Sequence, residues 1–136
     1  MRIDREVSSM SARIGEPFNL VAVRIGVGRD GAAVLLDDAR EPPSTVDGHL
    51  LQFVRMARAP PHGGERHDDG DEPILLLEGA IDILLDEGGP MQRTVELRAG
   101  QGFVVPRGVW RRLVIHQAAA LVVMTPGPSK LHRPPR

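Results

Sequence analysis

The fold of this chain is decided by two stretches of sequence, GERHDDGDEPILLLEG at residues 64–79 and GQGFVVPRGVWR at residues 100–111. In both, glycine and proline separate short runs of Val, Ile and Leu, which is the pattern of short β-strands joined by tight turns. An apolar strand, a Gly-Gly-Pro turn and a second strand lie between them. We expect the two stretches to form the two halves of one pocket.

Polar side chains gather at the start of the first stretch. Glu65 and His67 are two residues apart, so on an extended segment their side chains point the same way. The Asp-Asp-Gly sequence that follows has turn chemistry, because Asp side chains bond nearby backbone groups and glycine accepts a positive φ. Glu72 follows this turn. Glu65, His67 and Glu72 are therefore candidates for one polar site.

The rest of the chain also favours an all-β fold. Its 136 residues suit one domain, and its 15 glycines and 12 prolines are spread between short apolar runs. Turn signals about eight to twelve residues apart are typical of a β-sandwich or barrel, and a closed jelly roll also removes exposed strand edges. Strands are expected over residues 18–27, 32–36, 49–57, 73–77, 81–85, 94–97, 103–105, 111–115 and 120–124.

Three regions are expected along the chain. Residues 1–44 form an N-terminal arm, a β-hairpin and a loop packed on the barrel, with a short helix or an arm both open for residues 9–13. Residues 45–126 form the barrel, and residues 127–136 form a proline-rich, basic, extended tail. Largely buried side chains are expected at Ile74, Leu76, Ile83, Phe103, Val105 and Leu113.

The two stretches resemble the sequence motifs of the cupin superfamily. The first motif has the form His-x-His, three or four residues, Glu, six residues, Gly, and it is matched here by His67, Glu72 and Gly79. The second has the form Gly, five residues, Pro-x-Gly, two residues, His, and it is matched by Gly100, Pro106 and Gly108. The resemblance implies a double-stranded β-helix, the jelly-roll barrel of the cupins.

Two positions depart from these motifs. Glu65 stands where the first His belongs, and Arg111 stands where the last His belongs. In the family, three His and one Glu converge on a divalent metal, so the resemblance implies that Glu65, His67, Glu72 and Arg111 share one site. Arg111 cannot be a ligand, because a guanidinium stays protonated and has no lone pair to offer. One imidazole and two carboxylates remain as a metal-ligand set.

Three interpretations of Arg111 stay open. Glu65, His67 and Glu72 can hold a metal beside it, although two unit charges about 4 Å apart repel by roughly 4 kcal/mol at an effective dielectric of 20. Arg111 can instead form an internal ion pair with Glu65 or Glu72, because buried carboxylates require a cation. It can also bind a carboxylate or phosphate of a ligand in bidentate fashion.

Three classes of function follow from these interpretations. We favour a small single-domain cupin that binds a small polar or anionic molecule through Arg111, His67 and Glu72. Such a protein would carry no metal, or a weakly bound divalent metal such as zinc, manganese, iron or nickel. The first alternative is a metal-dependent isomerase, decarboxylase or dioxygenase that uses Glu65, His67 and Glu72. The second alternative is a catalytically inactive dimer scaffold.

Composition argues against several other classes. A net charge of −1 gives no bulk attraction to nucleic acid or to an anionic membrane. The absence of cysteine excludes disulfides and thiolate chemistry. The first 15 residues lack the apolar region of a signal peptide, and the longest apolar run, 118–124, is too short to span a membrane. We expect a soluble cytoplasmic protein.

The remaining histidines and the tryptophan have weaker interpretations. His62 lies on a Gly-Gly loop and is expected to be solvated, while His49 and His116 are expected at strand edges without a role. Trp110 precedes Arg111, so on a strand it points away from the interior. Together with the resemblance to cupins, that position leads us to expect a homodimer with Trp110 at the subunit contact.

Overall fold

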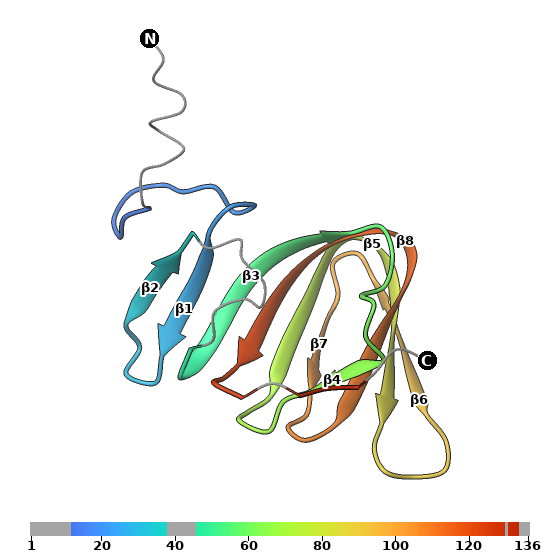
Figure 1. Cartoon of the computed structure of the whole chain (residues 1–136). Helices are drawn as coiled ribbons and strands as arrows, with labels where there is room; N and C mark the ends of the chain where they lie inside the picture. The colour runs from blue at the N-terminus through green and yellow to red at the C-terminus, as the bar shows by residue number, and fades with distance from the viewer. Residues whose placement is uncertain (1–11, 38–45, 130, 134–136) are drawn as a thin grey trace.

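The computed structural model describes residues 12–37, 46–129 and 131–133, and within these ranges the chain forms nine β-strands and no helix. The all-β prediction is therefore confirmed (Figure 1). None of the described residues belongs to a helix long and apolar enough to cross a membrane. The strands are β1 (Arg24–Gly28), β2 (Ala33–Leu36), β3 (Gly48–Met56), β4 (Gly64–Arg66), β5 (Glu72–Asp86), β6 (Arg93–Arg98), β7 (Gly102–Val105), β8 (Trp110–Pro126) and β9 (Leu131–Arg133).

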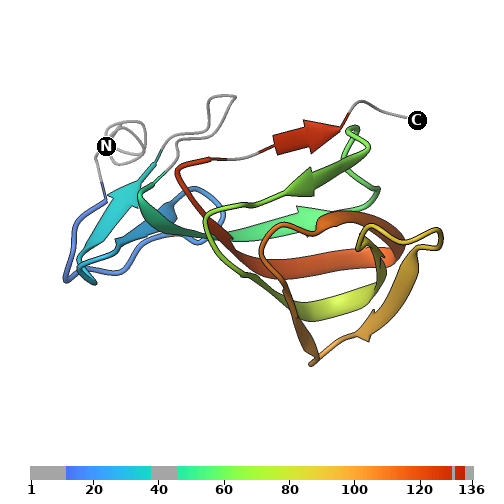
Figure 2. The same cartoon turned by 90° about the horizontal axis from the view of Figure 1, so that it is seen from below.

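Two long strands, β5 and β8, connect two antiparallel layers. The first half of β5 pairs with β7 on one side and with the second half of β8 on the other. Beyond β8, the layer continues through β3, β1 and β2, each paired with the strand before it. The second half of β5 pairs with β6 and with the first half of β8, which continues to β4 and β9. We call these the six-stranded layer (β2-β1-β3-β8-β5-β7) and the five-stranded layer (β6-β5-β8-β4-β9). Figure 2 shows them closing around the interior, with β1 and β2 extending to one side.

The bend of β5 between the layers explains the glycine of the first motif. Gly79 has a φ of +93°, and a Cβ there would meet the carbonyl oxygen of Ala118 and the Cα of Ala119. The pairing of β5 with β8 shifts register on both sides of Glu78. A residue with a side chain is therefore opposed by both the backbone conformation and the neighbouring strand.

We expect Gly79→Ala to lower the free energy of unfolding by about 2–4 kcal/mol. The alanine would be strained by the positive φ, and its Cβ would also clash with the backbone of β8. Gly88→Ala is a matched control, because Gly88 has the same φ of +93° but nothing within 4 Å of the Cβ position. Strain alone should cost about 1–2 kcal/mol there. Urea denaturation of both variants measures the difference, and equal costs would show that contact with β8 does not require glycine.

Alternating side chains of the two layers fill the barrel interior. Of the six predicted core residues, Ile74, Leu76, Ile83, Val105 and Leu113 are at most 2% exposed, and Phe103 is partly buried against them. Ile81, Leu85, Leu97 and Leu121 join the same cluster. The core prediction is thus confirmed, with Phe103 at its margin.

Two expectations outside the barrel differ from the structure. The strand predicted over residues 18–27 begins only at Arg24, because Asn19 forms a turn: its carbonyl accepts from the amides of Ala22 and Val23, and its side chain accepts from the Val21 amide. This Asx-type turn competes with the strand propensity of the neighbouring residues. The segment expected to be an extended tail contains β9, which pairs with β4. The helix or arm considered for residues 9–13 falls largely outside the described residues.

Candidate functional site

Strands β4, β5 and β8 bring the polar candidates together inside the barrel. Glu65 of β4 lies directly opposite Arg111 of β8, and Glu72 is the first residue of β5. Gly64 permits the close approach of β4 to β8, because its φ is +147° and a Cβ there would lie 3.0 Å from the carbonyl oxygen of Arg111. The prediction that the two stretches meet is confirmed.

Hydrogen bonds donated by two backbone amides join the loops of the two stretches. The amide of Gly108 donates to the carbonyl of His67 at 2.9 Å, and the amide of Arg107 donates to Asp71 Oδ1 at 2.8 Å. The Pro-Arg-Gly turn therefore holds the acidic turn that lies between His67 and Glu72. These contacts give the glycine of the second motif a structural role at the site.

Arg111 forms the ion pair that one of the three interpretations predicted. Its Nε donates to Glu72 Oε1 at 2.9 Å and its Nη2 donates to Glu72 Oε2 at 2.9 Å, which is a bidentate pair. Nη2 also donates to Glu65 Oε1 at 3.1 Å. Arg111 is 6% exposed and Glu72 is 1% exposed, so this is a buried network in which each charge depends on its partner.

His67 lies beside the same carboxylates without a well-aligned hydrogen bond. Its Nε2 is 3.2 Å from Glu65 Oε1 and 3.3 Å from Glu72 Oε2. Neither contact has the geometry of a hydrogen bond, and Nδ1 has no hydrogen-bond partner in the described part of the chain. The side chain is 3% exposed. A buried imidazole with an unpaired nitrogen is costly and calls for a physical explanation.

The charges of the site balance one another. Burial alone would lower the pKa of His67, but the neighbouring Glu65 and Glu72 outweigh burial and raise this pKa to about 9. Burial would raise the pKa of Glu72, but Arg111 and His67 lower it to about 2. Burial would likewise lower the pKa of Arg111, and the two carboxylates raise it instead. At neutral pH, two cations and two anions thus form a site without net charge.

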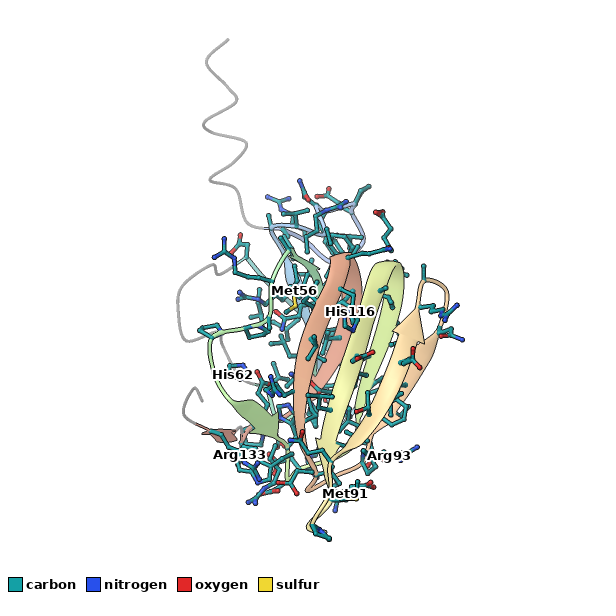
Figure 3. The ribbon with its side chains drawn as sticks, turned by 90° about the vertical axis from the view of Figure 1, so that its right-hand side faces the viewer. Met56, His62, Met91, Arg93, His116 and Arg133 are labelled. Atoms are coloured by element: carbon teal, nitrogen blue, oxygen red, sulfur yellow. The ribbon has the colours of Figure 1, made fainter. Side chains whose placement is uncertain are left out.

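His62 joins this site, contrary to the expectation that it is solvated. Its Nε2 lies 3.0 Å from Glu65 Oε2, and its Nδ1 accepts a hydrogen bond from the Gly64 amide at 3.2 Å. Its side chain is 19% exposed, and Figure 3 shows it in the segment that leads into β4. A tautomer with its proton on Nε2 satisfies both contacts. The spacing of three residues from Glu65 was the only sequence signal for this contact.

The other side chains considered lie outside the site. Trp110 points away from the interior, as predicted, and its ring is flanked by the guanidinium groups of Arg66 at 5.3 Å and Arg133 at 4.2 Å. His116 lies on the outer side of β8 (Figure 3) and pairs with Asp82 at 2.9 Å, so the expectation that it has no role omitted a surface ion pair. His49 is a partly buried residue of β3.

Glu65, His67 and Glu72 form the one group of three potential metal-ligand residues found among the described residues. One donor atom from each lies within 4.8 Å of the others. The resemblance to cupins implied this grouping, and the structure confirms it. Arg111 adds a fixed cation in direct contact with both carboxylates.

Solved structures with the same architecture are found at low sequence identity. A cupin-2 domain containing protein from Shewanella frigidimarina superposes with a TM-score of 0.50 at 14% identity, covering 93% of this chain and 94% of that one. An oxalate decarboxylase variant from Bacillus subtilis has a TM-score of 0.54 at 12% identity, covering 63% of this chain and 24% of that one. Streptomyces albus HEPD with 2-hydroxyethylphosphonate and Fe(II) bound has a TM-score of 0.51 at 18% identity, covering 60% and 19%.

These similarities establish the fold. No protein-family profile matches the sequence, and no curated protein matches it either. The chain spans about a quarter of the oxalate decarboxylase chain and about a fifth of the HEPD chain. Because the identities lie below the level at which a shared activity can be inferred, they support the cupin jelly-roll fold and not a reaction.

Proposed function

We propose that this cupin-fold protein binds a small organic anion inside the barrel and does so without a metal ion. The observation that carries the proposal is the bidentate pair of Arg111 with Glu72, extended to Glu65. In this arrangement a guanidinium stands at the position of the last histidine of the second cupin motif. It supplies the positive charge that the carboxylates would otherwise receive from a metal.

The donor atoms of the site do not suit a divalent cation in this arrangement. All four carboxylate oxygens of Glu65 and Glu72 lie within 3.1 Å of a nitrogen of Arg111 or His62. A metal would displace these contacts and lie close to a cation that cannot lose its proton. Metal-bound histidines also usually donate their second ring nitrogen to an acceptor, whereas Nδ1 of His67 lacks a partner in the described residues.

Glu65 offers a place where a ligand can exchange with the protein. It is the more exposed carboxylate of the site, at 14% against 1% for Glu72, and its contact with Arg111 is longer. Glu65 also contacts His62, which can retain it after Arg111 is released. A ligand carboxylate can then accept from Arg111 Nη2, and His67 is a second donor within the same group.

A thermal-unfolding titration tests this function. The wild type is prepared with a chelator and titrated with acetate, malonate and citrate, and separately with zinc, manganese, nickel and iron(II). We expect a carboxylate to raise the unfolding temperature in a saturable way and the metals to have little effect. Glu65→Gln removes the competing carboxylate, so it should respond to a lower concentration of the same anion. Failure of all three anions with both proteins would contradict the proposal.

A metal-dependent enzyme remains the second candidate, because Glu65, His67 and Glu72 hold potential ligand atoms within 4.8 Å of one another. When bound there, a divalent metal would act as a Lewis acid or redox centre. A strong response of the wild type to a micromolar divalent metal in the same titration would favour this candidate. Such binding would require Arg111 to move away from the carboxylates that it contacts.

A further inference from the structure

The strand that carries Glu65 depends on the C-terminal segment for its position. In the described part of the chain, β4 pairs with β8 at one position, where Glu65 lies opposite Arg111. It pairs with β9 at three positions, and the Gly63 amide just before β4 donates to the carbonyl of Arg133 at 2.9 Å. In Figure 2, β9 (red) lies along β4 at the edge of the five-stranded layer. Glu65 is therefore kept in the site more by β9 than by β8.

Arg133 attaches β9 to the long strands of the same layer. Its Nη2 donates to Asp86 Oδ2, at the end of β5, at 2.9 Å, and its guanidinium lies 4.2 Å from the centre of the Trp110 ring on β8. The side chains of Arg133 and Asp86 are 27% and 30% exposed, so water screens the pair less than it screens a fully exposed ion pair. We call Arg133, Asp86 and Trp110 the clasp. Figure 3 shows Arg133 on the same side of the barrel as His62.

Trp110 also contacts β4 directly. The guanidinium of Arg66, the residue after Glu65, lies 5.3 Å from the centre of the same ring. The indole is thus shared by two cations, one from β4 and one from β9. Without the clasp, β4 would retain the contact of Arg66 and its one pairing position on β8.

The C-terminal segment is also tied to a loop of the site. The Ser129 amide, two residues before β9, donates to Asp69 Oδ2 at 2.6 Å. Asp69 belongs to the turn that precedes Glu72 at the start of β5. The segment is therefore attached at Ser129 to the turn of the site and at Arg133 to the clasp. Its pairing with Glu65 lies between these two attachments.

Movement of β4 is needed before an anion reaches the site. Arg111, His67 and Glu72 are buried, and Glu65 accepts a hydrogen bond from Arg111 Nη2 at 3.1 Å. Glu65 is the carboxylate that an incoming anion would replace. Short strands near the end of a chain are among the parts of a protein that open most readily. The pair of β4 and β9 is thus the element suited to this opening.

We infer that the clasp positions Glu65 against Arg111 and that its release opens the site to an anion. Arg133 acts through β9 and β4, so it is a positioning residue. The step that admits an anion rests on the proposed function, whereas the positioning of Glu65 concerns the site without a ligand. The apparent dissociation constant of an anion is the intrinsic constant divided by the released fraction of molecules. The closed clasp therefore opposes binding.

Hydrogen exchange without a ligand tests the positioning of Glu65. Arg133→Gln removes the cation from the Trp110 ring and from Asp86. We expect the Gly63 amide and the Nε proton of Arg111 to exchange at least ~10-fold faster in this variant, because the local opening becomes more frequent. Amides at the centre of β5 should keep their rates. Acrylamide quenching of Trp110, the one tryptophan of the chain, should increase.

Two further variants are matched controls. Arg93→Gln also removes a guanidinium from an aromatic ring, that of Phe103 at 5.9 Å, and from a carboxylate, that of Glu87 at 4.0 Å. Arg93 lies on β6, which pairs with β5 and not with β4, so both exchange rates should stay at the wild-type value. Arg133→Lys keeps a cation at the clasp and should restore most of the protection.

Titration with malonate, followed by thermal unfolding, tests the admission of an anion. We expect the apparent dissociation constant to be ~10-fold lower for Arg133→Gln than for the wild type, in proportion to the released fraction. Faster exchange together with tighter binding supports the inference. Unchanged exchange in Arg133→Gln overturns it, and so does exchange that accelerates equally at the centre of β5, which would show a general loss of stability.

The two proposals fail in different ways. If Arg133→Gln exchanges faster and malonate binds both proteins equally, the clasp does not control the site and the inference is overturned, while the proposed function stands. If the exchange is faster but neither protein binds malonate, acetate or citrate, the proposed function is contradicted and the positioning of Glu65 by the clasp is supported.

Discussion

Glu72→Gln is expected to lower the free energy of unfolding by about 3–5 kcal/mol, because it leaves a buried guanidinium without its main partner. Glu72 accepts two hydrogen bonds from Arg111 and is 1% exposed. Glutamine has nearly the same shape, so the loss reports charge rather than packing. Urea denaturation at neutral pH measures the change, with the slope of the transition checked against the wild type.

Two further variants separate this explanation from a general sensitivity of the site. Glu65→Gln removes the negative charge of a carboxylate that is 14% exposed and accepts one hydrogen bond from Arg111, so we expect a smaller loss of about 1–2 kcal/mol. Combining Glu72→Gln with Arg111→Met removes both buried charges and should recover much of the lost stability. A larger loss in Glu65→Gln than in Glu72→Gln would show that Glu65 is the principal partner.

Arg111→His is expected to bind a divalent metal more tightly than the wild type does. The substitution removes the fixed cation and adds an imidazole to Glu65, His67 and Glu72, which gives two nitrogen and two oxygen ligands. Without metal, the variant should be less stable than the wild type, because Glu72 loses the bidentate pair. With zinc or manganese at one hundred times the dissociation constant, binding should stabilise it by about 2.7 kcal/mol.

Thermal unfolding at several metal concentrations, together with elemental analysis, measures this gain. Arg111→Met is the matched control, because it removes the same cation without adding a ligand. Adding His67→Ala to the Arg111→His protein should abolish the metal response. An equal response of wild type and variant would support the metal-dependent alternative. No response from Arg111→His would mean that position 111 does not direct an imidazole at the carboxylates.

The two residues that depart from the cupin motifs are in direct contact with each other. Arg111 and Glu65 stand where the two cupin motifs have histidines, and they contact each other across β4 and β8. The guanidinium satisfies carboxylates that a metal would otherwise neutralise, and the resulting group of two cations and two anions carries no net charge. This balance accounts for two buried carboxylates lying beside His67 and Arg111 in the barrel.

The local patterns of the sequence determined the strand framework and the membership of the site. Glycine and proline spacing predicted the turns, alternation predicted the core around Ile74 and Ile83, and the two motifs brought Glu65, His67, Glu72 and Arg111 together. The turns and the alternation depend on the conformation of a few adjacent residues, which is why they can be read from the chain, whereas the grouping of the four site residues was implied by the resemblance to cupins. The same reasoning missed the Asn19 turn, where a side chain competed with strand propensity.

Only the tertiary structure decided which partners these residues have. Arg111 contacts Glu65 because Gly64 lets β4 lie close to β8, and β9 of the C-terminal segment pairs with β4. The outward leucine at position 75 looks like a core residue in the run ILLL, and its exposure appears only when the register of β5, β7 and β8 is known. Such contacts join residues far apart in sequence, so they depend on how strands pair and not on the local propensity of either segment.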